Sequence, residues 1–204
     1  MKLYEPHQTS VEVNGKKYML EPTFDRVVRF LELCENPDLN DEDITEIAYS
    51  WLVKSPQNVD LSTKSAVIEK IKNEIISPPR RHILNGDAPK KCVDYNFDAA
   101  DIYASFMLDY NIDLIEQIGK MHWSKFIALF DGLSADTPIK RIMHIRAEKI
   151  PQLNPNHSNI KQIQRLVELK ALYALPEKQS PQEVNKTWNT LFDTLYKQAG
   201  DENG

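Results

Sequence analysis

The chain has 204 residues, of which 41% are hydrophobic and 27% are charged, and its formal net charge at pH 7 is −5. A chain of this length buries roughly 70% of its unfolded surface, so the composition is typical of a globular protein and excludes a disordered one. The negative balance disfavours nucleic acid as a partner, because nucleic-acid binders present a basic domain or stripe.

The ends and the cysteines carry little further signal. No run of about 18 apolar residues occurs, so we expect no membrane span. The N-terminal sequence, MKLYEPHQTS, has no apolar signal core, so secretion is not expected. Cys34 and Cys92 fit neither a metal-binding spacing nor a redox pair. Reduced thiols in a cytoplasm are the simplest interpretation.

The first predicted element is a β-hairpin over residues 10–22. Asn14 and Gly15 stand between alternating apolar residues, and both central residues of a type I′ turn need positive φ. This dipeptide is the strongest short hairpin signal, and Pro22 ends the element.

Three helices are predicted next, with Thr23, Asn40 and Ser62 as their capping residues. Apolar residues recur at helical spacing in each helix, which predicts one buried face apiece. The predicted buried residues are Phe24, Val27, Val28, Leu31 and Cys34, then Ile44, Ile47, Ala48, Trp51 and Leu52, and then Val67, Ile68, Ile71 and Ile75.

A boundary is predicted where Pro78 and Pro79 close the third helix. The sequence that follows, SPPRRHILNGDAPKKC, favours an irregular loop. We therefore divide the chain into 1–76, a linker at 77–94, and a helical region at 95–204, with the option that both halves pack as one domain. The basic residues at 80–91 are predicted to be a solvated loop, with contact to an acidic partner as the alternative.

The second half is predicted to be helical throughout. A helix near Asn96 is expected to bury Phe97, Ile102 and Phe106, and Gly132 is expected to end the next helix in the left-handed conformation. Further predicted starts are Thr137-Pro138, Ser158 and Ser180-Pro181. A solvated basic face is predicted for Arg141, His144, Arg146 and Lys149. The fold class is therefore mainly α, a multi-helix bundle with an N-terminal β-hairpin.

Catalytic and cofactor signatures are missing from the sequence. Asp98 and Asp101 share a helix face, but no histidine pair accompanies them, so neither a metal site nor acid–base chemistry is favoured. The chain has no nucleophile elbow, and its six glycines leave little room for a phosphate-binding loop. We expect a protein that is not an enzyme, has no cofactor and works by presenting surfaces.

Aromatic residues are the best candidates for partner binding, because large aromatics dominate interface hot spots. The candidates are Tyr103, Phe106, His122, Trp123, Phe126, Phe130, Trp188 and Phe192. The alternative is structural: Trp123 belongs to a helical core with His122 at its boundary, and the stripe of Trp188 and Phe192 docks on the body of the protein.

The order of several short motifs resembles a family of siphophage and prophage proteins, the gene-product-fifteen family. The matching segments are residues 10–18 (SVEVNGKKY), 101–106 (DIYASF), 110–114 (YNIDL), 122–126 (HWSKF), 129–133 (LFDGL) and 171–176 (ALYALP). The chain departs from the family at Ser124, where a second aromatic is common, and in the helix expected after Pro176.

The resemblance implies a function in protein interaction. The family is encoded between the major tail protein and the tape-measure protein, which is the position of tail-assembly chaperones. The implied partner is the tape-measure protein, with a companion tail-assembly chaperone or further copies of this chain as additional partners, in the cytoplasm of the bacterial host. The alternative is a structural tail component, such as a tail-completion or minor tail protein, without chaperone activity.

Overall fold

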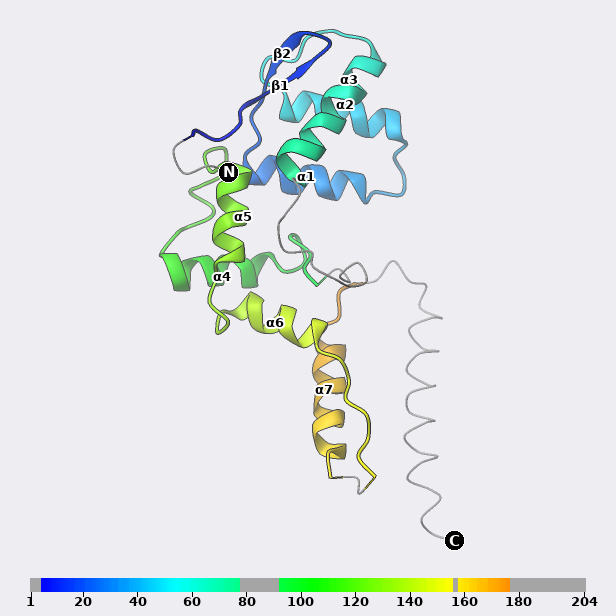
Figure 1. Cartoon of the computed structure of the whole chain (residues 1–204), viewed down its shortest axis with the longest axis vertical. Coiled ribbons are helices and arrows are strands. Elements are labelled where there is room, and N and C mark those ends of the chain that lie inside the picture. The colour runs from blue at the N-terminus through cyan, green and yellow to red at the C-terminus, as the bar shows by residue number, and fades with distance from the viewer. Residues whose placement is uncertain (1–4, 78–91, 156–157, 177–204) are drawn as a thin grey trace. The chain divides into compact units, whose positions relative to one another are not determined.

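The computed structural model describes residues 5–77, 92–155 and 158–176 (Figure 1). A two-stranded hairpin followed by helices confirms the predicted mainly α fold. The elements are β1 (Ser10–Val13), β2 (Lys16–Met19), α1 (Phe24–Cys34), α2 (Asp41–Leu52), α3 (Leu61–Ile71), the π-helical turn η1 (Lys72–Ile76), α4 (Ala99–Tyr110), α5 (Trp123–Asp131), α6 (Pro138–Ala147) and α7 (Ile160–Leu172).

The contacts divide the chain into two compact units, with the division after Ala147. The hairpin and α1 to α6 belong to the first unit, and α7 belongs to the second. The predicted linker at 77–94 stays a prediction, because residues 78–91 lie outside the described ranges.

The hairpin forms as its turn residues predict. Asn14 and Gly15 have φ angles of 52° and 71°, the positive values that a type I′ turn needs. The strands pair antiparallel with Val11 opposite Tyr18. Val11, Val13 and Tyr18 are all buried, so one face of the hairpin packs into the core, where β1 contacts α3.

Short polar side chains start α2 and α3. Asn40 caps α2 as predicted and accepts a hydrogen bond from the Asp43 amide at 2.9 Å. The predicted cap of α3, Ser62, was wrong: Asp60 is the cap and accepts from the Thr63 amide at 3.0 Å. Hydrogen bonds from the Ser62 and Thr63 side chains lower the pKa of Asp60 to about 2. The Asp60 carboxylate therefore accepts from the Thr63 amide and from both hydroxyl groups at the start of α3.

The buried face of α1 is rotated from the predicted one. Val27, Phe30 and Leu33 are buried, whereas Cys34 is exposed and Leu31 is partly exposed. Apolar residues occupy two overlapping stripes on this helix, so spacing alone leaves both orientations open. Packing against α2 on one side and α5 on the other selects the observed stripe.

Two segments far apart in the sequence pair side by side and connect the halves of the first unit. The amide of Phe24 donates to the Met121 carbonyl at 2.9 Å, and the amide of Trp123 donates to the Pro22 carbonyl at 2.8 Å. The indole of Trp123 also donates to the carbonyl of Ile76 at 3.1 Å. The start of α5 is thus fixed against both α1 and η1.

A buried ion pair fixes the start of α4 to the end of α6. The Arg146 guanidinium donates two hydrogen bonds to the Asp98 carboxylate, at 2.6 and 2.8 Å, and a third to the Cys92 carbonyl at 3.0 Å. The side chains of Asp98 and Arg146 are 2% and 7% exposed. The prediction that Arg146 lies on a solvated basic face was wrong, because a bidentate partner compensates the burial of its charge.

Gly132 follows α5 for a different reason than predicted. Its φ is −81°, so the left-handed conformation is absent here. A Cβ atom at this position would lie 3.1 Å from the Tyr110 hydroxyl oxygen and 3.3 Å from the Ala128 carbonyl oxygen. Glycine therefore leaves room for the Tyr110 hydroxyl, because a Cβ atom here would make unusually tight contacts.

In the second unit, α7 begins after Asn159, one residue later than the predicted cap at Ser158. The Asn159 side chain bonds within the preceding loop: its oxygen accepts from the Asn154 amide at 2.9 Å, and its nitrogen donates to the Gln152 carbonyl at 2.8 Å. The further helix predicted from Ser180, which carries Trp188 and Phe192, lies outside the described residues.

We expect Arg146→Met to destabilise the first unit strongly, because it leaves the Asp98 carboxylate buried without its partner. The expected loss is about 3–5 kcal/mol in the free energy of unfolding, measured by urea denaturation. The double variant Asp98→Leu with Arg146→Met should recover part of this loss, since no buried charge remains. Equal free energies of unfolding for wild type and Arg146→Met would contradict the stabilising role of this ion pair.

Candidate functional site

A cluster of aromatic side chains forms the interior where α1, α4 and α5 meet. Phe126 lies at its centre, with ring centroids 5.1 Å from Phe24 and 5.3 Å from Phe106, and both pairs are nearly parallel. Tyr95 packs edge-on against Trp123 and Phe126 at 5.7 and 6.0 Å. Such pairs add about 0.5–1.5 kcal/mol each beyond the area that they bury. The cluster therefore fixes α4 and α5 relative to α1.

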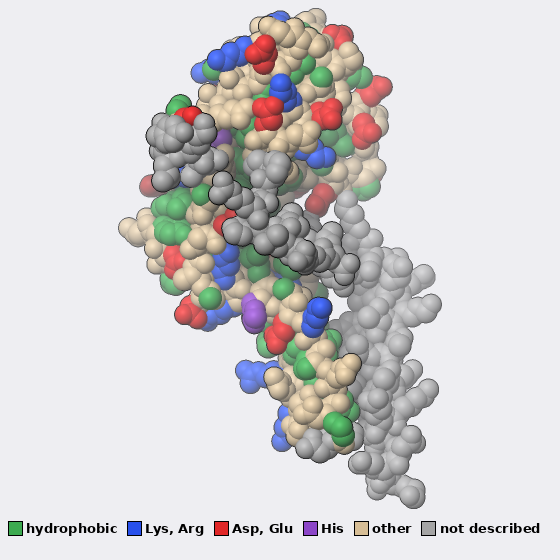
Figure 2. All heavy atoms as spheres, in the orientation of Figure 1, with side chains coloured by type: hydrophobic (Ala, Val, Ile, Leu, Met, Phe, Trp, Pro, Cys, Tyr) green, Lys and Arg blue, Asp and Glu red, His purple; other side chains and the backbone are tan. Residues whose placement is uncertain are grey.

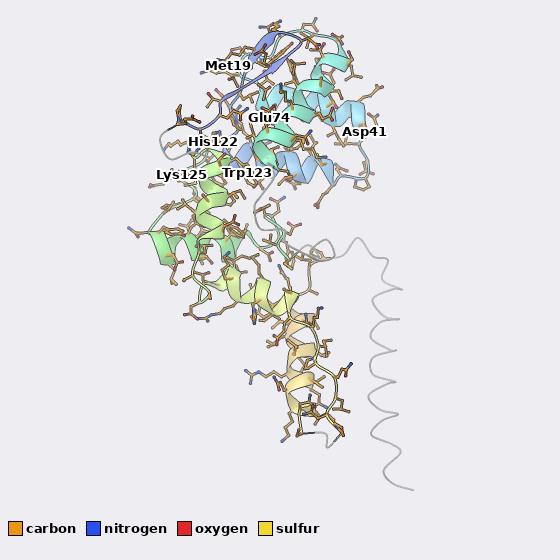
Figure 3. The ribbon with its side chains drawn as sticks, in the orientation of Figure 1. Met19, Asp41, Glu74, His122, Trp123 and Lys125 are labelled. Carbon is orange, nitrogen blue, oxygen red and sulfur yellow. The ribbon has the colours of Figure 1, made fainter. Side chains whose placement is uncertain are left out.

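Most of the aromatic residues predicted to bind a partner belong to this interior. Phe106, Trp123, Phe126 and Phe130 are each at most 3% exposed. Their side chains pack in the interior of the first unit and support its fold, and their role in partner binding stays a prediction. In Figure 3, Trp123 and Lys125 lie on different sides of α5, and of these two only Lys125 is exposed.

The other predicted residues have different positions. Tyr103 and His122 are partly exposed. Trp188 and Phe192 lie outside the described residues, so their role stays a prediction.

The solvent-facing side of α4 is apolar along its whole length. The exposed residues of this helix are Ala99, Ala100, Ala104, Met107 and Leu108. Leu108 is 70% exposed, and Phe97, just before the helix, is 56% exposed. The prediction that Phe97 faces inward was wrong, because the neighbouring Asp98 occupies the inward position to meet Arg146. Exposed apolar patches often mark interaction sites, so this face is a candidate docking surface.

The segment after α4 extends this apolar surface. Asn111 adopts the left-handed conformation, with φ of 51°, and the amide of Ile112 donates to the Phe106 carbonyl at 3.3 Å, which reverses the chain. Ile115 and Ile118 in this segment are 67% and 55% exposed. Figure 2 shows hydrophobic side chains gathered over the segment between α4 and α5, at the left of the view. We call this region, residues 97–108 and 115–118, the α4 surface.

Tyr103 marks one edge of the α4 surface. Burial of its hydroxyl raises the pKa of Tyr103, and the carboxylates of Asp113 and Glu116 raise that pKa further. The oxygen of Asp113 also accepts from the Ile115 amide at 2.8 Å, which shapes the turn beneath the exposed isoleucines. Tyr103 is therefore the predicted binding residue that the structure places beside exposed apolar side chains.

His122 caps α5 and holds the N-terminal segment. Its Nδ1 atom accepts from the Ser124 amide at 3.1 Å, so the proton of the neutral ring resides on Nε2. Nε2 lies 3.0 Å from the Gln8 carbonyl oxygen, to which it donates. The ring also stacks on His7 with centroids 4.6 Å apart. The burial of His122 lowers its pKa below 6.5, and the nearby His7 also lowers it, whereas the Gln8 bond opposes the shift.

A cavity of about 430 Å³ lies beside this histidine pair. Its walls are Pro6, His7, Thr9, Leu20, Glu21, Pro22, Thr23, Arg26, Gly119, Lys120 and His122. The Arg26 guanidinium is already bound, to Glu21 at 2.7 Å and to the Trp51 carbonyl at 2.6 Å. Because this guanidinium is already paired, we take the α4 surface, and not the cavity, as the candidate site.

Comparison with known proteins identifies the family. The family described as bacteriophage Gp15 protein matches residues 4–175. The chain belongs to this family. Membership makes it a bacteriophage protein and suggests a role connected with the phage tail. No curated protein and no solved structure matches the chain.

Neither a metal-binding cluster nor a membrane-spanning helix occurs among the described residues of this Gp15 protein. They contain no group of three or more His, Cys, Asp or Glu side chains placed to hold a metal ion. None of the helices in the same residues is long and apolar enough to cross a membrane.

Sequence reasoning missed the exposed side of α4, although a signal was present. Phe97, Ala100, Ala104 and Leu108 recur at three- and four-residue spacing, which is one helix face. The opposite face is equally apolar, so the sequence alone does not say which of the two is covered. The capping role of His122 was also missed, because histidine is not among the preferred capping residues.

We expect the stability of this Gp15 protein to fall as the pH drops below 6.5, and His122 to cause part of the fall. The unfolded chain binds a proton on this histidine near pH 6.5, whereas the folded chain binds it at lower pH. The contribution of neutral His122 is thus complete above pH 6.5 and is lost as the pH falls through the lowered pKa of the folded state. Urea midpoints across this range measure the effect.

The variant His122→Asn keeps a capping side chain that does not titrate, so its urea midpoint should depend less on pH in this window. His144→Asn is the control, because His144 is exposed on α6. At pH 8, His122→Ala should cost about 0.5–2 kcal/mol through loss of the cap. An identical pH dependence in wild type and His122→Asn would refute the assignment.

Proposed function

We propose that this protein is a tail-assembly chaperone that binds the tape-measure protein and keeps it soluble in the cytoplasm of the host. It acts by binding alone, without catalysis and without a cofactor. The observation that carries the proposal is the exposed apolar side of α4 with the isoleucines that follow it. A holding chaperone needs such a surface, because its client exposes apolar helix faces before assembly.

The α4 surface is presented on a rigid support. The aromatic cluster lies under α4, and the Asp98–Arg146 pair fixes the start of the helix. A rigid surface loses little conformational entropy on binding, so more of the apolar contact is available for affinity. Each leucine-sized side chain that becomes buried contributes about 1.5–3 kcal/mol.

The choice of the tape-measure protein as client follows from the family. Its members are encoded beside the tape-measure protein, in the position of tail-assembly chaperones. A tape-measure protein is long, so many copies of the chaperone can bind along one client. Weak contacts at each copy then suffice, because linked sites raise occupancy without tight individual binding. Release as tube subunits polymerise also favours weak contacts.

The first test is co-expression with the tape-measure protein encoded next to this chain. We expect a soluble complex with several copies per client, detected by pull-down and size-exclusion chromatography. Leu108→Gln should weaken this complex at least about tenfold, because it removes a large part of the exposed apolar area. Met19→Gln is the matched control, since Met19 is 46% exposed on the hairpin, outside the α4 surface.

A tape-measure protein that stays insoluble and unbound in the presence of wild-type protein would overturn the proposal. The alternative of a structural tail component then makes its own prediction, which is that the chain is found in purified phage particles. A chaperone is absent from mature particles, so mass spectrometry of purified particles separates the two functions.

A further inference from the structure

We infer that the α4 surface is built for a partner helix that carries lysine or arginine beside its apolar stripe. The inference deepens the proposed function and rests on it for the identity of the partner protein. It specifies the chemistry of the segment that binds, which the apolar face alone does not.

The charged residues within the segment that carries the α4 surface are all acidic. Residues 92–119 contain six acidic residues and no Lys, Arg or His. Three of the six are engaged elsewhere: Asp98 pairs with Arg146, Asp109 accepts from the amide and the hydroxyl of Ser134, and Asp94 accepts from the amides of Asn96 and Phe97. Within the part of the chain that the structure describes, Asp101, Asp113 and Glu116 form no ion pair.

These carboxylates border the apolar strip on both sides. On α4, Asp101 lies one helical turn from Ala104 and is partly exposed. Asp113 and Glu116 lie at the other border, beside the Tyr103 hydroxyl. A helix laid along α4 would therefore meet apolar side chains under its centre and carboxylates along both edges.

This arrangement selects among possible occupants by charge. A helix with acidic flanks is disfavoured, because like charges would be brought together as water leaves the contact. A helix with lysine or arginine flanks gains attraction at both edges, and the long aliphatic parts of those side chains add apolar contact. The length of α4 matches about three turns, or about 18 Å, of a partner helix.

The probe for the test is a pair of helical peptides with the same apolar stripe, one with lysine and the other with glutamate at the flanking positions. Binding to the full-length protein is measured by fluorescence anisotropy at low and high salt. We expect the lysine peptide to bind at least about tenfold more tightly than the glutamate peptide, and the difference to shrink as salt rises. A lysine peptide with a scrambled apolar stripe should bind weakly.

Charge variants locate the effect on the α4 surface. The double variant Asp101→Asn with Glu116→Gln should weaken the lysine peptide about three- to tenfold. The matched control is Asp41→Asn with Glu42→Gln, which removes the same charge from the exposed start of α2. Circular dichroism checks that all variants are folded.

Several results would overturn the inference. The first is equal binding of the two peptides, and the second is an equal effect of the two double variants. The third is a concentration-dependent dimer that Leu108→Gln abolishes, because a second copy of this chain would then occupy the α4 surface. Pull-down of the tape-measure protein distinguishes failure of this inference from failure of the proposed function. If the client binds wild type and the Asp101/Glu116 variant equally, the inference fails and the proposed function stands. If the lysine peptide binds but the client does not, the proposed function fails and the inference stands.

Discussion

The short antiparallel contact between residues 22–24 and 121–123 is the constraint on which the first unit depends. It joins backbone groups about a hundred residues apart and fixes the start of α5 between α1 and η1. Once α5 is held there, Trp123 reaches the Ile76 carbonyl and Phe126 reaches Phe24. The helices α1 and α5 then enclose two sides of the aromatic interior, and α4 encloses a third.

The two sides of α4 show how this interior leads to a surface. Its inner side carries Phe106 and the buried Ser105, whose hydroxyl accepts from the Ile139 amide of α6 at 3.1 Å. Within the part of the chain that the structure describes, the outer side of α4 carries exposed apolar residues. α4 is thus packed firmly on one side and apolar on the other, and the proposed docking surface rests on this combination.

Several local features were predictable from the sequence, whereas pairing over long distances was not. Asn14-Gly15 and Asn40 act through their own neighbours, so the hairpin and the cap of α2 followed directly. The partner of Asp98 is Arg146, 48 residues away, and nothing in the spacing of either residue indicates the other. The limited space beside Gly132 likewise depends on Tyr110, which lies on another helix. The candidate binding residues were chosen for their aromatic content, and Phe106, Trp123, Phe126 and Phe130 among them are buried. The apolar surface that the structure exposes on α4 is mostly aliphatic.

The proposed function depends on contact between the outer side of α4 and the tape-measure protein. A photo-reactive amino acid placed at position 108, in cells that also express the tape-measure protein, tests it most directly. We expect covalent adducts with the tape-measure protein from position 108 and few or none from position 19, which is exposed on the hairpin. No adduct from position 108, or equal adducts from both positions, would contradict it.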